Sequence, residues 1–275
     1  MDRTAPVGVF DSGVGGLTVA REIMRQIPNE RIVYFGDTAR VPYGSKSKET
    51  IIRYSRQIIR FLRTQDVKAI VIACNTASAY ALETVAAESD IPVIGVINAG
   101  ARTAAAVTRN GKIGVIGTLG TVDSGIYKKV IQDIRPELEV TQKACPLFVP
   151  LVEEGLLHDS VTDEIASRYL SDLKSKYIDT LVLGCTHYPL LRSTLRRLMG
   201  EDVTLVNPAY ETAIELKHLL EEHDMLRMEE SGADKENREK YQFFVSDLAE
   251  RFTTFASSIL PNEVRTTKKI NIEKY

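Results

Sequence analysis

Short runs rich in valine and isoleucine alternate along the chain with longer stretches in which apolar residues recur every three or four positions. The short runs predict β-strands and the longer stretches predict amphipathic helices, an alternation typical of α/β proteins. The predicted strands are Val7–Phe10, Arg31–Gly36, Ala69–Ala73, Val93–Val96, Ile113–Gly117, Leu138–Lys143, Thr180–Leu183, Val203–Val206 and Tyr241–Val245, with one more within Thr266–Ile272. The predicted helices are Leu17–Gln26, Lys48–Thr64, Ala77–Glu88, Ala99–Arg109, Thr162–Lys176, Leu190–Met199 and Glu211–Glu222.

A similar pattern occurs twice. The apolar strand Ala69–Ala73 runs into Cys74, Asn75 and Thr76, and the apolar strand Thr180–Leu183 runs through Gly184 into Cys185-Thr186-His187. The two cysteines stand 111 positions apart. This spacing is far too long for a solenoid repeat and favours two related domains. In open α/β sheets, ligands bind at the carboxyl ends of the strands. We therefore expect two similar three-layer α/β domains with mostly parallel sheets, related by a pseudo-twofold axis, and an active site in the cleft between them.

The first domain is expected to comprise residues 1–97 together with 208–275, and the second domain residues 98–207. The polar stretch Glu229–Lys240 is interpreted as a solvated loop or linker. The chain of 275 residues is long enough for two such domains.

Composition narrows the class of protein. The chain is 44% hydrophobic and 26% charged, with a formal net charge of −2 and a pI near 6.2. A nearly neutral chain gives no electrostatic indication of nucleic-acid or anionic-membrane binding. No stretch approaches the roughly 20 apolar residues that span a bilayer. Three cysteines, an odd number, argue against a disulfide scaffold and for a reducing, cytoplasmic compartment.

A glycine-rich turn, Asp11–Gly16, follows the first strand and precedes a helix. It suggests a dinucleotide-binding loop, and Asp37 stands where a ribose-binding acid would. The G-x-G-x-x-G pattern fails at its last position, which is Thr18. What remains is either a tight turn that requires glycine or a turn whose N–H groups bind an anion. Asp11 and Ser12, a carboxylate and a hydroxyl at a sheet edge, are candidates for chemistry rather than packing.

The cysteines differ in context. Cys145 lies between alanine and proline without polar neighbours, and we interpret it as a structural thiol. Cys74 and Cys185 each end an apolar strand and are followed by hydrogen-bonding side chains. The chain contains no C-x-x-C or H-x₃-H pair, which argues against a metal site. A hydrolase with Cys185 as nucleophile and His187 as base is possible chemically, but it leaves Cys74 without a role.

A two-base reaction uses both thiols. Inversion of a stereocentre by proton transfer needs one acid/base group on each side of the carbon, one protonated and the other not. Thiols suit this task because their unperturbed pKa, about 8.5, can be brought toward 7 by local charge and hydrogen bonds. Two homologous halves that each supply one thiol also provide the near-symmetry that a mirror-image reaction requires.

Four ordered motifs strengthen this hypothesis and resemble the cofactor-independent aspartate/glutamate racemase family, in particular its glutamate-specific members. They are Phe10–Leu17 (FDSGVGGL), Tyr34–Gly44 (YFGDTARVPYG), Ala73–Ala79 (ACNTASA) and Gly184–Leu190 (GCTHYPL). The resemblance implies racemisation of L-glutamate to D-glutamate without cofactor or metal. It also implies a cytoplasmic enzyme, commonly a homodimer, that supplies D-glutamate for peptidoglycan.

The resemblance assigns roles to residues of this chain. Cys74 takes the α-proton from D-glutamate and Cys185 takes it from L-glutamate. Asp11 assists Cys74, while Glu153 and His187 assist Cys185. The implied substrate contacts are Asp11, Ser12, Tyr43, Gly44, Asn75, Thr76, Thr186 and His187, with Thr118 and Thr121 as weaker candidates.

Three rival hypotheses remain at this point. An aspartate racemase usually carries glutamate after the second Cys-Thr, where this chain has His187. A nucleotide-dependent oxidoreductase would use the glycine-rich turn, and Thr18 weighs against it. An amino-acid-binding sensor with the same clamshell architecture would have no use for two facing thiols.

Overall fold

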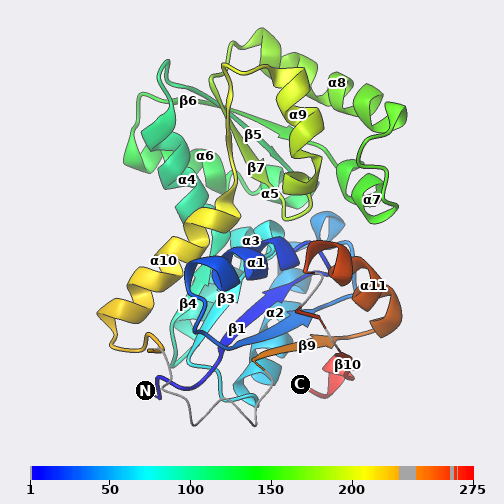
Figure 1. Cartoon of the computed structure of the whole chain (residues 1–275). Coiled ribbons are helices and arrows are strands. Elements are labelled where there is room, and N and C mark those ends of the chain that lie inside the picture. Colours follow the sequence, from blue (N-terminus) through cyan, green and yellow to red (C-terminus); the bar gives the residue numbers. More distant parts are fainter. Residues whose placement is uncertain (1, 229–239, 261–262, 265) are drawn as a thin grey trace.

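The computed structural model describes residues 2–228, 240–260, 263–264 and 266–275. These residues form two parallel β-sheets, one above the other in Figure 1, with helices on the faces of each. The predicted α/β class is therefore confirmed. The loop predicted over Glu229–Lys240 lies, apart from its last residue, outside the described residues.

The larger sheet consists of β1 (Val7–Asp11), β2 (Ile32–Gly36), β3 (Ala69–Ile72), β4 (Val93–Gly95), β9 (Tyr241–Val245) and β10 (Thr267–Lys269). Its strand order is β10-β9-β2-β1-β3-β4, and every neighbouring pair is parallel. The central strands β1, β2 and β3 are buried throughout, because apolar side chains on both faces pack against helices. The short strand β10 confirms the additional strand predicted near the C-terminus.

The smaller sheet consists of β5 (Lys112–Gly117), β6 (Glu139–Ala144), β7 (Thr180–Gly184) and β8 (Thr204–Val206). Its order, β6-β5-β7-β8, reproduces the β2-β1-β3-β4 portion of the larger sheet. All its neighbouring strands are also parallel. The strands that precede the two cysteines, β3 and β7, occupy corresponding places, as the sequence repeat predicts.

Each sheet is the middle of three layers. We call the larger sheet and its helices the first lobe, and the smaller sheet and its helices the second lobe. The first-lobe helices are α1 (Leu17–Gln26), α2 (Lys48–Arg63), α3 (Asn75–Ala87), α10 (Pro208–Glu222) and α11 (Ala249–Ile259), with 3₁₀ turns η1 (Tyr43–Ser45) and η3 (Ile272–Lys274). The second-lobe helices are α4 (Val96–Val107), α5 (Leu119–Asp123), α6 (Ile126–Ile134), α7 (Phe148–Glu153), α8 (Ser160–Ser175) and α9 (Arg192–Met199), with the 3₁₀ turn η2 (Tyr188–Leu191).

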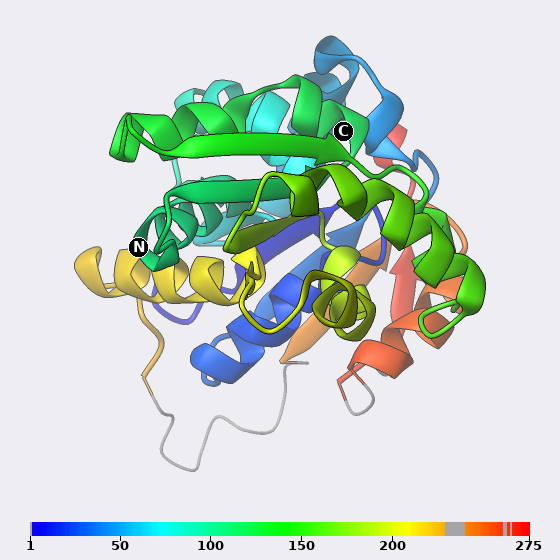
Figure 2. The same ribbon diagram turned by 90° about the horizontal axis from the view of Figure 1, so that it is seen from above.

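Apolar cores fill both faces of each sheet. In the first lobe α1, α10 and α11 pack on one face and α2 and α3 on the other. In the second lobe α7, α8 and α9 cover one face, and α4 and α6 cover the opposite face. The chain passes from the first sheet to the second after β4 and returns after β8, where α4 and α10 pack against each other. In the view from above, the second lobe covers the first (Figure 2).

Four helices, α3, α4, α8 and α10, begin two or three residues earlier than the sequence pattern predicts. α3 starts at Asn75, directly after Cys74, although asparagine and threonine are poor helix formers. α4 starts at Val96, which was expected to end a strand because β-branched residues favour strands. There the Val96 N–H donates to the Ser78 hydroxyl, 3.3 Å away, and the chain turns into the helix. No helix in the described ranges is both long and apolar enough to cross a membrane.

Candidate active site

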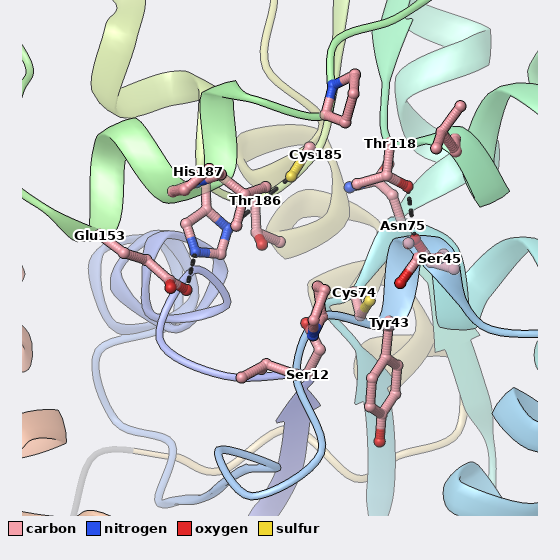
Figure 3. Close-up of a pocket in the computed structure, with 18 residues that line it drawn as sticks. Ser12, Tyr43, Ser45, Cys74, Asn75, Thr118, Glu153, Cys185, Thr186 and His187 are labelled. Carbon is pink, nitrogen blue, oxygen red and sulfur yellow. Dashed lines mark hydrogen bonds and ion pairs between the residues drawn. The ribbon is translucent and has the colours of Figure 1, made fainter.

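A cavity of about 320 Å³ lies between the two lobes, at the carboxyl ends of their strands. Figure 3 shows its side chains, with Cys185 entering from the second lobe and Cys74 from the first. The lining residues are Ser12, Val41, Pro42, Tyr43, Gly44, Ser45, Cys74, Asn75, Thr76, Thr118, Leu119, Pro146, Val149, Pro150, Glu153, Cys185, Thr186 and His187. None of these lining residues is a lysine or an arginine.

The two cysteines occupy equivalent places in the two lobes, each just after the corresponding strand. We call Cys74–Thr76 the first thiol turn and Cys185–His187 the second thiol turn. Cys74 is the N-cap of α3, and Cys185 follows β7 directly. Both thiols are free and buried, with exposed fractions of 5% and 6%. Burial, and then the negative charge of Asp11, raise the pKa of the Cys74 thiol to about 12, so this thiol is protonated at neutral pH.

His187 lies between a thiol and a carboxylate. Its Nδ1 is 3.9 Å from Cys185 Sγ and its Nε2 is 3.1 Å from Glu153 Oε1. Burial alone would lower the pKa of His187, but the contacts with Cys185 and Glu153 outweigh it and raise the pKa to about 10. The structure therefore brings together the three residues predicted for the Cys185 side, with His187 as an imidazolium beside the sulfur.

Asp11 is fully buried behind the cavity and is not among its lining residues. Its Oδ2 accepts hydrogen bonds from Gly16 N at 2.9 Å and Gly13 N at 3.1 Å. The Thr186 hydroxyl, from the other lobe, donates to Oδ1 at 3.5 Å. Burial raises the pKa of Asp11 despite these contacts and the nearby His187. The anion that the glycine-rich turn binds is thus the carboxylate of Asp11 itself, which weakens the dinucleotide interpretation of this turn.

Tyr43 and Gly44 approach the cavity in different ways. The Tyr43 hydroxyl donates to buried Asp37, and Figure 3 shows the ring pointing away from the cavity. Tyr43 therefore presents its backbone rather than its hydroxyl to a ligand. Gly44 lies so close to the second lobe that a Cβ there would be 2.6 Å from Thr118 Cβ. Only glycine permits this approach.

Threonine hydroxyls join the lobes beside Cys74. Thr76 Oγ1 is 2.8 Å from Thr118 Oγ1 and 3.3 Å from Thr121 Oγ1, and the last two are 3.0 Å apart. Thr118 and Thr76 line the cavity, whereas Thr121 is fully buried behind them. Eleven residues besides the cysteines were candidates. Asp11 and Thr121 do not border the cavity, whereas the other nine do: Ser12, Tyr43, Gly44, Asn75, Thr76, Thr118, Glu153, Thr186 and His187.

Sequence reasoning missed part of the cavity wall. The cavity is also lined by Val41, Pro42, Ser45, Leu119, Pro146, Val149 and Pro150. The signal for Ser45 and Val41 was adjacency to the Pro42-Tyr43-Gly44 motif. The apolar residues of α5 and α7 carry no comparable signal. The sequence alone does not show whether a leucine or valine lines a cavity or lies on ordinary surface. Among the described residues no three histidine, cysteine or acidic side chains gather as a metal site.

The chain thus folds into two α/β lobes, and each lobe supplies one buried thiol to a shared cavity. Residues 8–215 match the family model described as Asp/Glu/Hydantoin racemase. The chain belongs to this family and is an isomerase. The resemblance stated from the four sequence motifs is confirmed, and the oxidoreductase and sensor hypotheses lose their support.

Within the family, the similar proteins are glutamate racemases. The chain is 49% identical over 268 residues to the glutamate racemase of Geobacter metallireducens, covering 97% of both chains. It is 44% identical over 272 residues to that of Enterococcus faecalis, covering 99% of this chain and 98% of the relative. Crystal structures of a Bacillus anthracis glutamate racemase isoform and of the Francisella tularensis enzyme in complex with D-glutamate match with TM-scores of 0.91 and 0.90, at 42% and 38% identity. They cover 98% and 99% of this chain, and 98% and 100% of their own chains. The aspartate racemase of Picrophilus torridus, at 16% identity and a TM-score of 0.57, shares the fold alone.

Proposed function

We propose that this enzyme interconverts L-glutamate and D-glutamate without a cofactor, using Cys74 and Cys185 as its two acid/base groups. The observation that carries the proposal is the entry of two free, buried thiols into one cavity from opposite lobes. A carbon held between them can lose a proton on one face and gain one on the other. The names of the similar proteins support glutamate as the substrate.

The two thiols have different charged neighbours, Asp11 beside Cys74 and His187 beside Cys185. Cys74, whose pKa is raised to about 12, supplies a proton. The protonated His187 stabilises negative charge on Cys185, which acts as the base. In the direction that starts from L-glutamate, Cys185 takes the α-proton and Cys74 delivers a proton to the opposite face. After one turnover the two thiols have exchanged protonation states and are ready for D-glutamate.

The reverse reaction needs a thiolate at Cys74. Hydrogen bonds from the Ala77 N–H and the Ser12 hydroxyl lower the pKa of Cys74, opposing burial and the Asp11 charge. The Ala77 contact comes from the first turn of α3, where backbone N–H groups favour an anion. Asp11 assists the Cys74 side by holding the glycine-rich turn in place, and its charge favours the protonated Cys74 thiol that delivers a proton in the forward direction.

Apart from the imidazolium of His187, the groups that we expect to bind the substrate are neutral donors. Glutamate brings two carboxylates and an ammonium, and the cavity offers no lysine or arginine among its lining residues to meet them. Hydroxyls, an amide and backbone N–H groups serve instead, and Glu153 supplies a carboxylate at the partly exposed edge. The proposed contacts are Ser12, Tyr43, Gly44, Asn75, Thr76, Thr186 and His187, with Asp11 and Thr118 behind or beside them.

The remaining parts of the proposal concern the setting of the reaction. The domains divide as 1–97 with 208–275 and 98–207, close to the two points where the chain crosses between the sheets. The enzyme works in the bacterial cytoplasm as a homodimer and supplies D-glutamate for peptidoglycan. These statements rest on the family resemblance. Sedimentation of the purified chain tests the dimer, since a monomer mass at micromolar concentration contradicts it.

Proton NMR with L-glutamate in D₂O, without added cofactor and alongside circular dichroism, tests the reaction. We expect the α-proton signal and the optical activity to decay together. Cys74→Ala and Cys185→Ala should abolish racemisation while keeping the far-ultraviolet dichroism of the folded chain. Cys145→Ala is the matched control, because this third buried thiol does not line the cavity, and it should remain active. Full racemase activity in either of the first two variants contradicts the two-base mechanism, and activity on aspartate alone contradicts the substrate.

A further inference from the structure

One fully buried tyrosine reaches from the second lobe into the first thiol turn. Tyr127 lies in the first turn of α6, and its hydroxyl donates a 2.7 Å hydrogen bond to Asn75 Oδ1. The two residues are 52 positions apart and belong to different lobes. The Tyr127 ring also packs beside Gly184, where an added Cβ would lie 3.2 Å from Tyr127 Cε2. One side chain thus touches the residue after Cys74 and the residue before Cys185.

This contact decides which end of the Asn75 amide is available to a ligand. Asn75 lines the cavity and is only 4% exposed. Its Oδ1 is occupied by the Tyr127 hydroxyl, and within the described part of the chain its Nδ2 has no hydrogen-bond acceptor. Because Asn75 borders the cavity, an N–H₂ group with both of its donors free can bind a ligand that brings an acceptor oxygen there.

A second contact repeats the arrangement in the opposite direction. The Thr18 hydroxyl, on α1 of the first lobe, lies 3.1 Å from the backbone oxygen of Thr186 in the second thiol turn and 2.9 Å from the backbone oxygen of Gly15, so these two oxygens share its one proton. α1 follows β1, and α6 follows β5 after the short helix α5, and these two strands hold equivalent places in their sheets. Each lobe therefore places a hydroxyl on the thiol turn of the other lobe. Such reciprocity indicates that these hydroxyls fix the two turns relative to each other.

We propose that Tyr127 is a positioning residue that holds the Asn75 amide with its N–H₂ toward the cavity, where it donates to a carboxylate oxygen of the substrate. The inference rests on the proposed function, because it assumes an amino-acid carboxylate in this cavity. Tyr127 itself does not line the cavity and acts through Asn75.

Steady-state kinetics with Tyr127→Phe tests the role. Without the hydroxyl the amide is free to rotate, so we expect KM for glutamate to rise about 3- to 10-fold while kcat changes less than about 2-fold. The matched control is Tyr188→Phe, which removes the hydroxyl of another fully buried tyrosine whose 2.9 Å bond, to the Cys145 backbone oxygen, stays within its own lobe. That variant should keep the wild-type KM.

A double-mutant comparison isolates the path through Asn75. In an Asn75→Ala background, Tyr127→Phe should add less than about a 2-fold change to KM, because the amide that it positions is gone. An equal KM in the two phenylalanine variants overturns the inference. A full Tyr127→Phe effect that persists without Asn75 also overturns it.

A measurement independent of activity separates this inference from the proposed function. In ¹⁵N-labelled enzyme, the side-chain amide signals of Asn75 are identified by their loss in Asn75→Ala. They should shift and broaden in Tyr127→Phe and stay unchanged in Tyr188→Phe. Unchanged signals in Tyr127→Phe refute the positioning role whatever the enzyme catalyses. Absence of glutamate racemisation by the wild-type enzyme refutes the proposed function while the amide result still decides the role of Tyr127.

Discussion

Glu153 Oε1 lies 3.1 Å from His187 Nε2, so the carboxylate at the end of α7 holds the ring whose other nitrogen faces Cys185. The Glu153 side chain is 30% exposed, whereas the His187 side chain is only 5% exposed. The pair therefore connects the edge of the cavity to the buried sulfur. Because an imidazolium in this position is stabilised from both sides, positive charge is retained beside Cys185 at neutral pH.

We expect His187→Asn to lower kcat by about 10²- to 10³-fold if Cys185 is the base that we propose, since the substitution removes the cation beside its sulfur. Glu153→Gln should lower kcat by about 10-fold, because Glu153 acts through His187 and is partly solvated. The two enantiomers have equal free energies in water, so kcat/KM should fall equally in both directions. Circular dichroism measures both.

Glu154→Gln is the matched control for Glu153→Gln. Glu154 is the neighbouring residue, but its carboxylate lies 3.3 Å from exposed Arg251 instead. This variant should keep wild-type kinetics. Equal activities of the two glutamine variants would contradict the role of Glu153.

The pH dependence of stability should report His187 directly. Its pKa is raised to about 10 in the folded enzyme, against about 6.5 in an unfolded chain. Below about pH 6.5 both states carry the proton and the stabilisation is complete. As the pH rises toward 10 the unfolded state loses the proton first, so the stabilisation is lost over this window.

Thermal unfolding between pH 6 and 10 measures this effect. The midpoint for the wild-type enzyme should fall more steeply than the midpoint for His187→Asn, while His223→Asn at the exposed end of α10 should keep the wild-type slope. The shared contribution of Cys74, whose pKa is also raised, cancels in this comparison. Parallel curves for the wild type and His187→Asn would refute the assigned charge.

The sequence allowed prediction of the strands, their parallel arrangement and the two thiol turns, because these depend on local periodicity and on the placement of polar residues after apolar runs. It could not choose between Glu153 and Glu154 from the residues alone, since that choice depends on which carboxylate reaches His187 across the lobe. The start of α3 at Asn75 was missed for a similar reason. Helix propensity disfavours Asn75 and Thr76, but their placement in the first turn is set by tertiary contacts.

The contacts between the lobes could not be predicted from local sequence patterns. Tyr127 and Thr18 look like ordinary helix residues in the sequence, and their importance appears only when both lobes are in place. The glycine-rich turn was easy to recognise in the sequence, but its pattern fitted both a tight turn and an anion-binding turn. In the structure two of its N–H groups bind Asp11, and Gly15 allows the second lobe to approach.

Gly15 is where that approach is closest. A Cβ on Gly15 would lie 2.3 Å from Thr186 Oγ1 and 2.5 Å from His187 Nδ1, both in the second thiol turn. Gly15→Ala should therefore push this turn away from the first lobe and lower kcat/KM by about 100-fold or more. Gly13→Ala serves as the control, because its nearest neighbour would be the side chain of Val41 at 3.2 Å, which is 39% exposed and able to shift. Comparable losses in both variants would show that any alanine in the turn is harmful and that the lobe contact is not the cause.

At the amino end of β3, which is opposite to the end that precedes Cys74, a substitution should change stability without changing catalysis. Lys68 precedes this strand, whereas Cys74 follows it, so Lys68 lies at the edge of the sheet remote from the cavity. Its Nζ is 2.7 Å from Glu30 Oε2, with both side chains only 1% exposed, and it also donates to the backbone oxygens of Arg3 and Met225. Burial lowers the pKa of Lys68, and the contact with Glu30 opposes this shift.

Lys68→Met leaves the Glu30 carboxylate buried without its ion-pair partner, so we expect the free energy of unfolding in urea to fall by about 3–5 kcal/mol. The exposed pair Arg56–Glu88, with side chains 43% and 47% exposed, provides the comparison, and Arg56→Ala should cost less than about 1 kcal/mol. Racemase kcat/KM at 25 °C should stay within about 2-fold of the wild-type value in both variants, because neither touches the thiol turns. A loss of unfolding free energy in Lys68→Met no larger than in Arg56→Ala would mean that the buried charge pair contributes no more than a surface one. A large loss of kcat/KM in the still-folded Lys68→Met enzyme would instead mean that the amino end of β3 is coupled to the position of Cys74.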